Sequence, residues 1–393
     1  MKKYSALKNK YLDHIKGKPN VVGIGVGKRQ VNKKLTDEKA VVVLVSKKVP
    51  EEALRKEELI PRQLEGKSVD VMEIGEVCFL GEKKKEEGEE EEGQGENKTR
   101  ITGTTTPSSA VTAKKARKYS WSLSEKRAQR IEMESLKERT GKHRPAIGGI
   151  SIGHYLITAG TLGAAVYDKA GAGGDRKLFA LSNNHVLANS STGNDGRAAR
   201  GDKVLQPGAY DGGRDPDDTW GYLERFVPLK KGKTICMTAF IGEKIINQIL
   251  AFLAVDYRVK FKKNNDRENL VDAAVAKPIM DGNLSTEILG LGKAAGIAEA
   301  NVGQEVVFSG RTSGIRKGVV LAKDVHISVA MEDGEPVMFA DQLVTSAIAL
   351  PGDSGSLLLD NEKNAVGLIF AGSDIASIGN RMENVAALLQ IEI

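Results

Sequence analysis

The stretch Leu350-Pro351-Gly352-Asp353-Ser354-Gly355-Ser356-Leu357-Leu358-Leu359 places a serine between two glycines, after an aspartate and at the start of an apolar run. A serine hydroxyl is a weak nucleophile unless a base removes its proton and nearby N–H groups stabilise the oxyanion that forms. Glycines on both sides of Ser354 allow a tight turn that exposes the hydroxyl and directs backbone N–H groups into one concavity. The same pattern also fits a simple turn leading into a strand. A base and an orienting carboxylate elsewhere in the chain would favour the chemical interpretation.

The composition indicates a folded protein with more than one unit. The chain has 393 residues, 40% of them hydrophobic, and its 43 glycines against 11 prolines predict many turns. Lysine and arginine total 58 and acidic residues 52, so the net charge is only +6. Basic residues are not interleaved with aromatic ones, as they are in proteins that bind single-stranded nucleic acid. We therefore expect no nucleic-acid partner.

The cysteines and the apolar runs bear on the compartment. Cys78 and Cys236 are the only two cysteines, which excludes a disulfide framework and favours a reducing compartment. The N-terminus lacks the apolar core of a signal peptide, and the apolar run 245–255 is too short to span a membrane. These patterns predict a soluble, cytoplasmic protein without a membrane partner.

Residues 1–80 are predicted to form a small α/β domain with strands near 20–27, 40–45 and 69–74. Gly23, Gly25 and Gly27 do not have the spacing of a dinucleotide-binding loop, and no apolar helix follows them. A glycine-containing hairpin is the better interpretation. Residues 81–118 are rich first in charge and then in Thr and Ser, which predicts a linker that buries too little apolar area to fold.

The rest of the chain is predicted to be a connecting helix followed by a β domain. Residues 119–144 contain the capping pair Ser122 and Glu125 and sparse apolar positions, typical of a docking helix. Short apolar runs separated by turn residues fill 145–393 and predict a sandwich or barrel. An insertion near 230–265 is interpreted as a packing helix, with a further pair of strands as the alternative.

His185 is the best candidate for the base. It follows the apolar run 178–182 directly, in Asn183-Asn184-His185-Val186, so its imidazole is expected on the turn that closes a buried strand. A capping or core histidine remains the alternative. The other histidines lie in a charged helix-like stretch, beside a helix end, in a turn and in an alternating strand: His14, His143, His154 and His326.

The orienting carboxylate should be semi-buried and within reach of the imidazole Nδ1–H. Asp272, within the apolar run 270–276, meets this condition, because a charge in such a run is costly to bury without a partner. Asp256, in Ala254-Val255-Asp256-Tyr257, is the competing candidate. The order is then His185, Asp272, Ser354, one of the three orders in which unrelated folds carry this triad.

These motifs together resemble trypsin-like serine peptidases of the chymotrypsin clan. The residues that carry the likeness are 183–186, Val271-Asp272-Ala273-Ala274-Val275 and Gly352-Asp353-Ser354-Gly355-Ser356. The chain is similar, more narrowly, to bacterial relatives of the NARROW LEAF-type trypsin-like proteins, in Gly160-Thr161-Leu162-Gly163, 206–208 and 370–373. The resemblance covers about 145–393 and implies a mainly β fold, a chymotrypsin-like double β-barrel, preceded by the α/β segment and the linker.

The resemblance also implies roles for individual residues. Ser354 would be the nucleophile, His185 the general base and then acid, and Asp272 the group that fixes the imidazole tautomer. The oxyanion hole would be formed by the backbone N–H groups of Gly352 and Ser354. The edge that pairs with a substrate strand would contain Phe370, Ala371 and Gly372, and Ile348 would lie at the base of a pocket for a small or medium apolar side chain.

The sequence departs from the family in how Asp353 is held. Ile147-Gly148-Gly149-Ile150 only faintly resembles the activation terminus of zymogen-type enzymes, so Asp353 is expected to need another cation, such as Arg311.

The function predicted from these patterns is that of a serine endopeptidase acting on a polypeptide substrate, with no metal or cofactor. One alternative is a catalytically idle protease fold that binds peptides or acts as a scaffold. Another is a zymogen inhibited by residues 1–80 and released by cleavage within 81–118. A homo-oligomer is left open.

Overall fold

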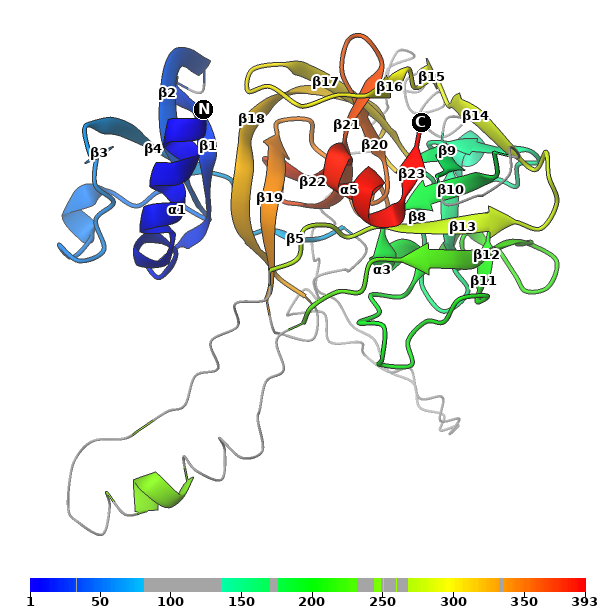
Figure 1. The fold of residues 1–393 in the computed structure, drawn as a ribbon, viewed down its shortest axis with the longest axis horizontal. Helices are drawn as coiled ribbons and strands as arrows, with labels where there is room; N and C mark the ends of the chain where they lie inside the picture. Colours follow the sequence, from blue (N-terminus) through cyan, green and yellow to red (C-terminus); the bar gives the residue numbers. More distant parts are fainter. Residues whose placement is uncertain are drawn as a thin grey trace, which may run out of the picture.

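The computed structural model describes residues 1–32, 34–80, 136–169, 176–231, 244–248, 250, 259, 268–331 and 336–393. These residues are mainly β-stranded and form two barrel-like sheets side by side, with the N-terminal elements on the outer flank of the second (Figure 1). The prediction of a mainly β, chymotrypsin-like double barrel is confirmed. No described helix is both long and apolar enough to cross a membrane.

The N-terminal elements build a short extension of the second barrel's sheet. They are α1 (Lys2–Lys16), β1 (Val21–Val31), β2 (Lys34–Val45), the 3-10 turn η1 (Glu51–Ala53), β3 (Gln63–Leu64), β4 (Lys67–Glu73) and β5 (Cys78–Phe79). β1 and β2 form the hairpin predicted from the glycine run, and β2 pairs in parallel with β4. The other edge of β1 pairs antiparallel with β18 (Gly314–Val329) of the second barrel.

The apolar run of β2 is continuous because both of its faces are covered. Val41 and Val43 pack with α1 on one face, and Val42 and Leu44 pack towards the barrel on the other. A strand buried on both faces reads as an unbroken hydrophobic run rather than an alternating one. The glycines of β1 face the barrel closely, since a Cβ on Gly23 would lie 2.7 Å from the His326 carbonyl oxygen.

The first barrel-like sheet is built from strands between residues 151 and 278, together with the last strand of the chain, β23 (Ile391–Glu392). Its strands run in the order β23-β9-β10-β13-β12-β11-β7-β8 and enclose a cluster that contains Trp220 and Leu162. The elements of this part are β6 (Ala146–Gly148), β7 (Ser151–His154), β8 (Gly160–Thr161), β9 (Ala164–Asp168), β10 (Leu178–Ser182), α3 (Asn184–Leu187), β11 (Lys203–Leu205), the 3-10 turn η2 (Ala209–Asp211), β12 (Thr219–Phe226) and β13 (Ala274–Pro278).

The second barrel is a closed ring. Its strands run β17-β20-β21-β22-β19-β18, and the additional pairing of β17 with β18 joins the two ends. Phe308, Leu343 and Leu358 lie in its interior. The remaining elements are β14 (Leu284–Ile288), β15 (Gly292–Lys293), β16 (Gly296–Ile297), β17 (Glu305–Gly310), β19 (Val337–Thr345), β20 (Leu357–Leu359), β21 (Asn364–Gly372), β22 (Ser377–Arg381), α5 (Met382–Leu389) and β23 (Ile391–Glu392).

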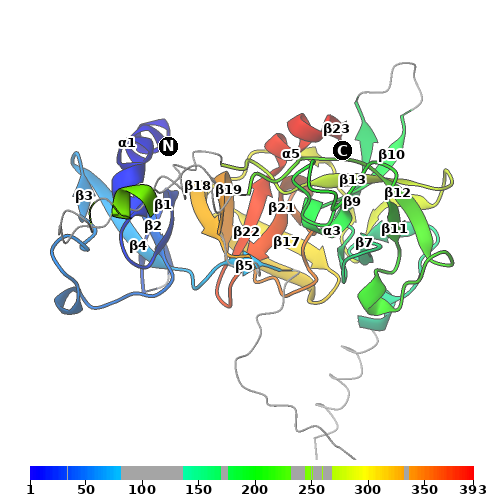
Figure 2. The same cartoon turned by 90° about the horizontal axis from the view of Figure 1, so that it is seen from below.

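β5 connects the N-terminal elements to the region between the two barrels. It leaves β4, crosses the second barrel and pairs antiparallel with the end of β21 (Figure 2). The described residues stop at Leu80 and resume at 136, so the predicted linker 81–118 lies outside them. Of the predicted helix 119–144, residues 136–140 are helical, and most of the predicted insertion 230–265 is also outside. The predicted domain boundaries stay predictions.

Candidate active site

His185 is held by a short helix at the end of a buried strand, as the sequence predicts. β10 ends at Ser182, and α3 presents the imidazole, which is only 8% exposed. The Nδ1 atom of His185 lies 2.5 Å from Oδ2 of Asp272. The Nε2 atom is buried and has no hydrogen-bond partner among the described residues. One ring nitrogen is therefore fixed by a carboxylate, and the other is left for a further group.

Asp272 is fully buried just before β13, and its position is fixed from several sides. Its Oδ1 atom accepts a hydrogen bond from the His185 backbone N–H at 3.2 Å. Its own N–H donates to Oδ1 of Asn380, and its carbonyl accepts from the amides of Asn183 and Asn380. Sequence reasoning missed Asn380, because it lies in β22, 108 residues further along the chain. The competing candidate Asp256 lies outside the described residues.

Ser354 lies in a turn that only glycine neighbours can make. Gly352 has φ +96° and Gly355 has φ +94°, a region that L side chains rarely adopt. A Cβ at Gly355 would also meet the Thr161 carbonyl oxygen at 2.3 Å. The Ser354 hydroxyl is buried and donates to the carbonyl of Phe370 at 3.3 Å, so its proton is directed at β21 rather than at His185.

Thr161 joins the serine turn to the first barrel. Its N–H donates to the Ser354 carbonyl at 2.7 Å, and its hydroxyl donates to the Gly352 carbonyl at 2.8 Å. The same hydroxyl accepts from the Arg311 backbone N–H. The residue stands in the motif 160–163 that carried part of the resemblance, but that motif alone does not reveal this contact. Thr161 keeps the two halves of the candidate site in register.

The expectation that Arg311 neutralises Asp353 is wrong. The Asp353 carboxylate instead accepts backbone N–H bonds from Thr312, Ser313 and Leu350, at 2.8 to 3.0 Å. Because backbone N–H groups satisfy a carboxylate well, no direct cation is needed. The Arg311 guanidinium forms an ion pair with Asp211.

Arg139 is a buried cation that the sequence did not single out. Its Nη1 donates to the carbonyls of Gly149 and Gly310 and to the Ser309 hydroxyl. Burial lowers the pKa of this guanidinium, and the nearby carboxylates of Glu138 and Asp353 oppose that shift. Arg139 therefore supplies positive charge near Asp353 and fastens residues 136–140 to Gly149 and to the end of β17.

The three residues predicted to bind a substrate strand are buried at the end of β21, and β5 lies against them. Ala371 pairs with Phe79 and Gly372 pairs with Cys78, in antiparallel register. The Leu80 N–H donates to the Phe370 carbonyl at 3.4 Å. The predicted substrate edge is thus already paired with a strand of the same chain.

The predicted oxyanion-hole donor Gly352 is likewise occupied. Its N–H donates to the Leu80 carbonyl at 2.8 Å. The role of the Ser354 N–H as the second donor stays a prediction. Ile348 is half-buried, and the buried cluster that contains Leu80 includes Ala347 and Ala349 on either side of it. Its place at the base of a pocket also stays a prediction.

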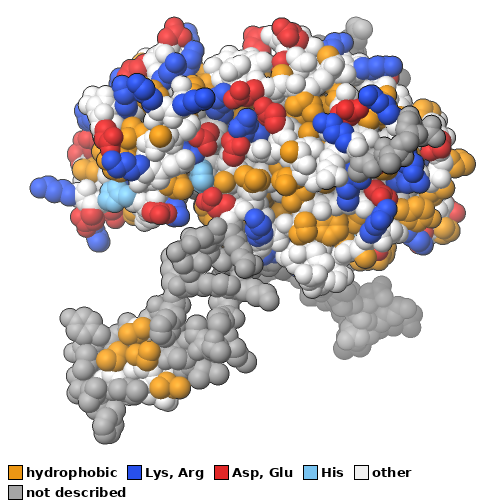
Figure 3. Space-filling model, viewed as in Figure 1, with side chains coloured by type: hydrophobic (Ala, Val, Ile, Leu, Met, Phe, Trp, Pro, Cys, Tyr) orange, Lys and Arg blue, Asp and Glu red, His pale blue; other side chains and the backbone are white. Residues whose placement is uncertain are grey.

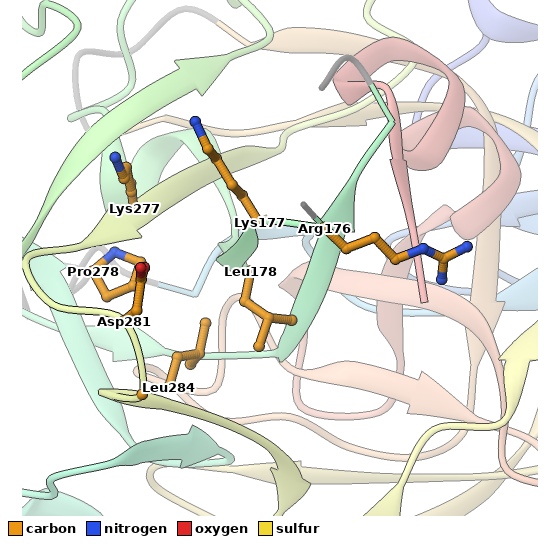
Figure 4. A pocket seen from close by; sticks show the side chains of 8 residues that line it. Arg176, Lys177, Leu178, Lys277, Pro278, Asp281 and Leu284 are labelled. Carbon is orange, nitrogen blue, oxygen red and sulfur yellow. The ribbon is translucent and has the colours of Figure 1, made fainter. Parts of the chain in front are cut away.

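A hollow of about 400 Å³ lies between Lys177, Leu178, Lys277 and Asp281 at the far side of the first barrel (Figure 4). It contains neither His185 nor Ser354. Acidic and basic side chains are interspersed over the face seen in Figure 3, without one large region of a single sign, in keeping with the small net charge.

Comparisons with known proteins find similarity at the level of structure. No protein-family model matches the chain, and no curated protein matches it. Among solved structures, Thermobifida fusca protease A has 15% sequence identity and a TM-score of 0.38, over 63% of this chain and 96% of that one. The Nocardiopsis protease NAPase has 16% identity and a TM-score of 0.37, over 62% and 96%.

A third similar structure is the chymotrypsin of Cellulomonas bogoriensis, with 17% identity and a TM-score of 0.36, over 63% of this chain and 97% of that one. The neighbours are bacterial chymotrypsin-fold serine proteases. At these TM-scores the likeness assigns no activity to this chain.

Proposed function

We propose that this protein is a serine endopeptidase that hydrolyses peptide bonds through an acyl-enzyme. One observation carries the proposal. The Nδ1 atom of the buried His185 imidazole is hydrogen-bonded to Asp272, whereas its Nε2 atom has no partner among the described residues. A histidine that served only the core would be expected to satisfy both nitrogens. General base catalysis requires an imidazole with one nitrogen held by a hydrogen bond and the other available to accept a proton.

Each residue then has a separate task. Asp272 keeps the proton of the neutral imidazole on Nδ1, so that Nε2 presents its lone pair. His185 takes the proton of Ser354 as the hydroxyl attacks the peptide carbonyl, and later returns a proton to the leaving amine. The Gly352 N–H stabilises the oxyanion. These steps need no metal or cofactor.

The substrate we propose is a polypeptide bound as an added strand along Phe370, Ala371 and Gly372. Backbone pairing supplies affinity that does not depend on side chains, and the buried apolar cluster behind Gly372 favours an aliphatic residue before the scissile bond. A cytoplasmic location and kinship with the NARROW LEAF-type proteins are part of this proposal.

A fluorophosphonate probe that labels activated serines tests the proposal. We expect the wild-type chain, or the same chain nicked within 81–118 by an added protease, to be labelled. Ser354→Ala and His185→Ala should lose the label. Matched controls are Ser356→Ala, two residues away, and His154→Gln, since Ser356 donates to the Asp353 carbonyl and His154 lies in another His–Asp pair. Absence of labelling in both wild-type forms would refute the enzyme.

The second candidate, an idle peptide-binding protein, is favoured by the hydrogen bond from Ser354 to Phe370. A serine that keeps this orientation cannot pass its proton to His185. This candidate predicts that the nicked chain binds a peptide but neither reacts with the probe nor hydrolyses a fluorogenic tetrapeptide with leucine before the scissile bond. The endopeptidase predicts both reactions, so the two candidates give opposite results in one assay.

A further inference from the structure

Residues 77–80 occupy the candidate active site in the manner of a substrate strand. β5 adds to the edge of β21 with Cys78 opposite Gly372 and Phe79 opposite Ala371, and the strand direction is antiparallel. The Leu80 N–H and the Ser354 hydroxyl share one acceptor, the Phe370 carbonyl. The backbone of Leu80 therefore lies beside the candidate nucleophile.

The carbonyl of Leu80 is the decisive group. It accepts a hydrogen bond from the Gly352 N–H at 2.8 Å. A donor placed next to a nucleophilic serine is where the oxygen of the attacked carbonyl must lie as its charge develops. A strand that only completed a sheet would need its edge pairing with β21 but not this contact beyond the strand's end.

The side chains of Phe79 and Leu80 pack in different places near the candidate site. Leu80 is 4% exposed in the apolar cluster of the second barrel, and its Cδ2 atom would lie 3.4 Å from a Cβ placed on Gly372. The Phe79 ring lies edge-on to the His185 ring, with centroids 5.2 Å apart. Leu80 thus takes the place of the residue before a scissile bond, and Phe79 covers the imidazole.

We propose that the chain is its own substrate and cleaves the peptide bond between Leu80 and Gly81. This inference rests on the proposed endopeptidase function and identifies the site on which that function acts first. Its second part is that the new C-terminus at Leu80 stays beside Ser354 and competes with other substrates, which slows the product without abolishing its activity. Residues 1–80 remain held because β1 pairs with β18 and Val77 accepts from the Ala330 N–H at 2.9 Å.

The reaction balances with water as the only co-reactant. The Ser354 hydroxyl turns from Phe370 to His185, loses its proton to Nε2, and attacks the carbonyl carbon of Leu80. The bond to the Gly81 nitrogen breaks, and that nitrogen takes the proton from His185. Water, deprotonated by His185, then hydrolyses the ester, which releases the Leu80 carboxylate and restores Ser354.

The experiment compares the full-length wild type with Ser354→Ala by intact mass and N-terminal sequencing after purification. We expect two wild-type fragments, 1–80 and 81–393, that co-elute in gel filtration, and an uncut Ser354→Ala chain. Cleavage should follow first-order kinetics independent of protein concentration. A cut at another bond, or the same cut in Ser354→Ala, would overturn the proposal.

Two substitutions at Leu80 test the register. Leu80→Met should be cut within about tenfold of the wild-type rate, since the apolar volume is kept. Leu80→Asp should be cut more than about 100-fold more slowly, because its carboxylate cannot enter an apolar pocket without a partner. It should hydrolyse the leucyl tetrapeptide faster than cleaved wild type does, because its cleft is no longer filled. Equal self-cleavage of the two variants would refute the register.

The outcomes separate this inference from the proposed function. An intact wild-type chain that still reacts with the fluorophosphonate probe and hydrolyses the leucyl tetrapeptide after nicking within 81–118 is an endopeptidase that does not cut itself. That result overturns only the self-cleavage. An intact chain that shows neither reaction in either form overturns the endopeptidase, and self-cleavage with it.

Discussion

Among the described residues of the first barrel, two buried histidines each pair with an aspartate, and the two pairs differ in whether the second ring nitrogen has a partner. In the pair of His154 and Asp202, Nε2 lies 3.2 Å from the carboxylate, and Nδ1 accepts a hydrogen bond from the Leu156 N–H. Both ring nitrogens are used. In the pair of His185 and Asp272, only Nδ1 has a partner among the described residues.

The difference shows that a partner carboxylate does not by itself make a histidine chemically active. Both imidazoles are buried, and both are oriented by an aspartate. His154 ends β7 and has a partner on each ring nitrogen, whereas His185 has one ring nitrogen without a partner among the described residues and a ring that lies edge-on to Phe79. The candidate base is identified by its ring nitrogen without a partner, and not by its pairing with an aspartate.

The largest expected effect is the loss of activity when the aspartate of the His185 pair, but not that of the His154 pair, is replaced by asparagine. Asp272→Asn should lower kcat/KM for the leucyl tetrapeptide by about 10⁴-fold, because an amide can stabilise the wrong imidazole tautomer. Asp202→Asn should leave kcat/KM within about threefold and cost about 1 kcal/mol in unfolding free energy. Steady-state kinetics on the nicked proteins measure the first, and urea unfolding the second. Similar kinetic losses in both variants would remove the distinction between the pairs.

A smaller effect is expected from the residue that holds Asp272. Asn380→Ala leaves the Asp272 N–H without its acceptor, so we expect a loss of about 1–3 kcal/mol in unfolding free energy. A displaced Asp272 should also lower kcat by on the order of 10–100-fold. Asn384→Ala, which removes a hydrogen bond to Asp341 on the same side of the fold, is the matched control. A stability loss with unchanged kcat would mean that Asn380 does not position the carboxylate.

The smallest expected effect is the contribution of His154 to the pH dependence of stability. Burial lowers the pKa of His154 below its ordinary value of 6.5, although the hydrogen bond that the ring donates to Asp202 opposes this. Below pH 6.5 the unfolded chain therefore binds more protons than the folded one, and stability falls as pH decreases towards the folded pKa. A single proton limits the slope to about 1.4 kcal/mol per pH unit. His154→Gln should reduce this slope between pH 6.5 and 5 in urea titrations, and identical slopes would contradict the assignment.

The sequence predicted the parts of the site that are encoded locally. A glycine-flanked serine, a histidine directly after an apolar strand and an aspartate inside an apolar run each carry their own signal, and the structure brings His185 and Asp272 together. The glycine hairpin of β1 and β2 is confirmed for the same reason, since its turn and alternation lie within one stretch.

The contacts that sequence reasoning missed or misjudged depend on the tertiary fold. The sequence suggested that Asp353 needs a cation. Its actual partners, the N–H groups of Thr312 and Ser313, lie in the turn between β17 and β18, which only the tertiary fold brings to Asp353. The occupation of the cleft by Leu80 could not be predicted either, since 77–80 reads as the end of an ordinary apolar run. Its position immediately before the acid-rich range 81–118 is the one signal that could have drawn attention to it.

Because β1 pairs with β18, a cut after Leu80 would make unfolding depend on protein concentration. Gly23 to Gly27 of β1 lie opposite Ile327 to Ala322, and Lys8 of α1 donates to the Asp324 carboxylate at 2.6 Å, so residues 1–80 adhere to the barrel without help from the chain that follows. An uncut chain unfolds in a unimolecular step. A chain cut after Leu80 unfolds into two pieces, so its melting temperature rises with protein concentration, and dilution alone becomes a means of separating the pieces.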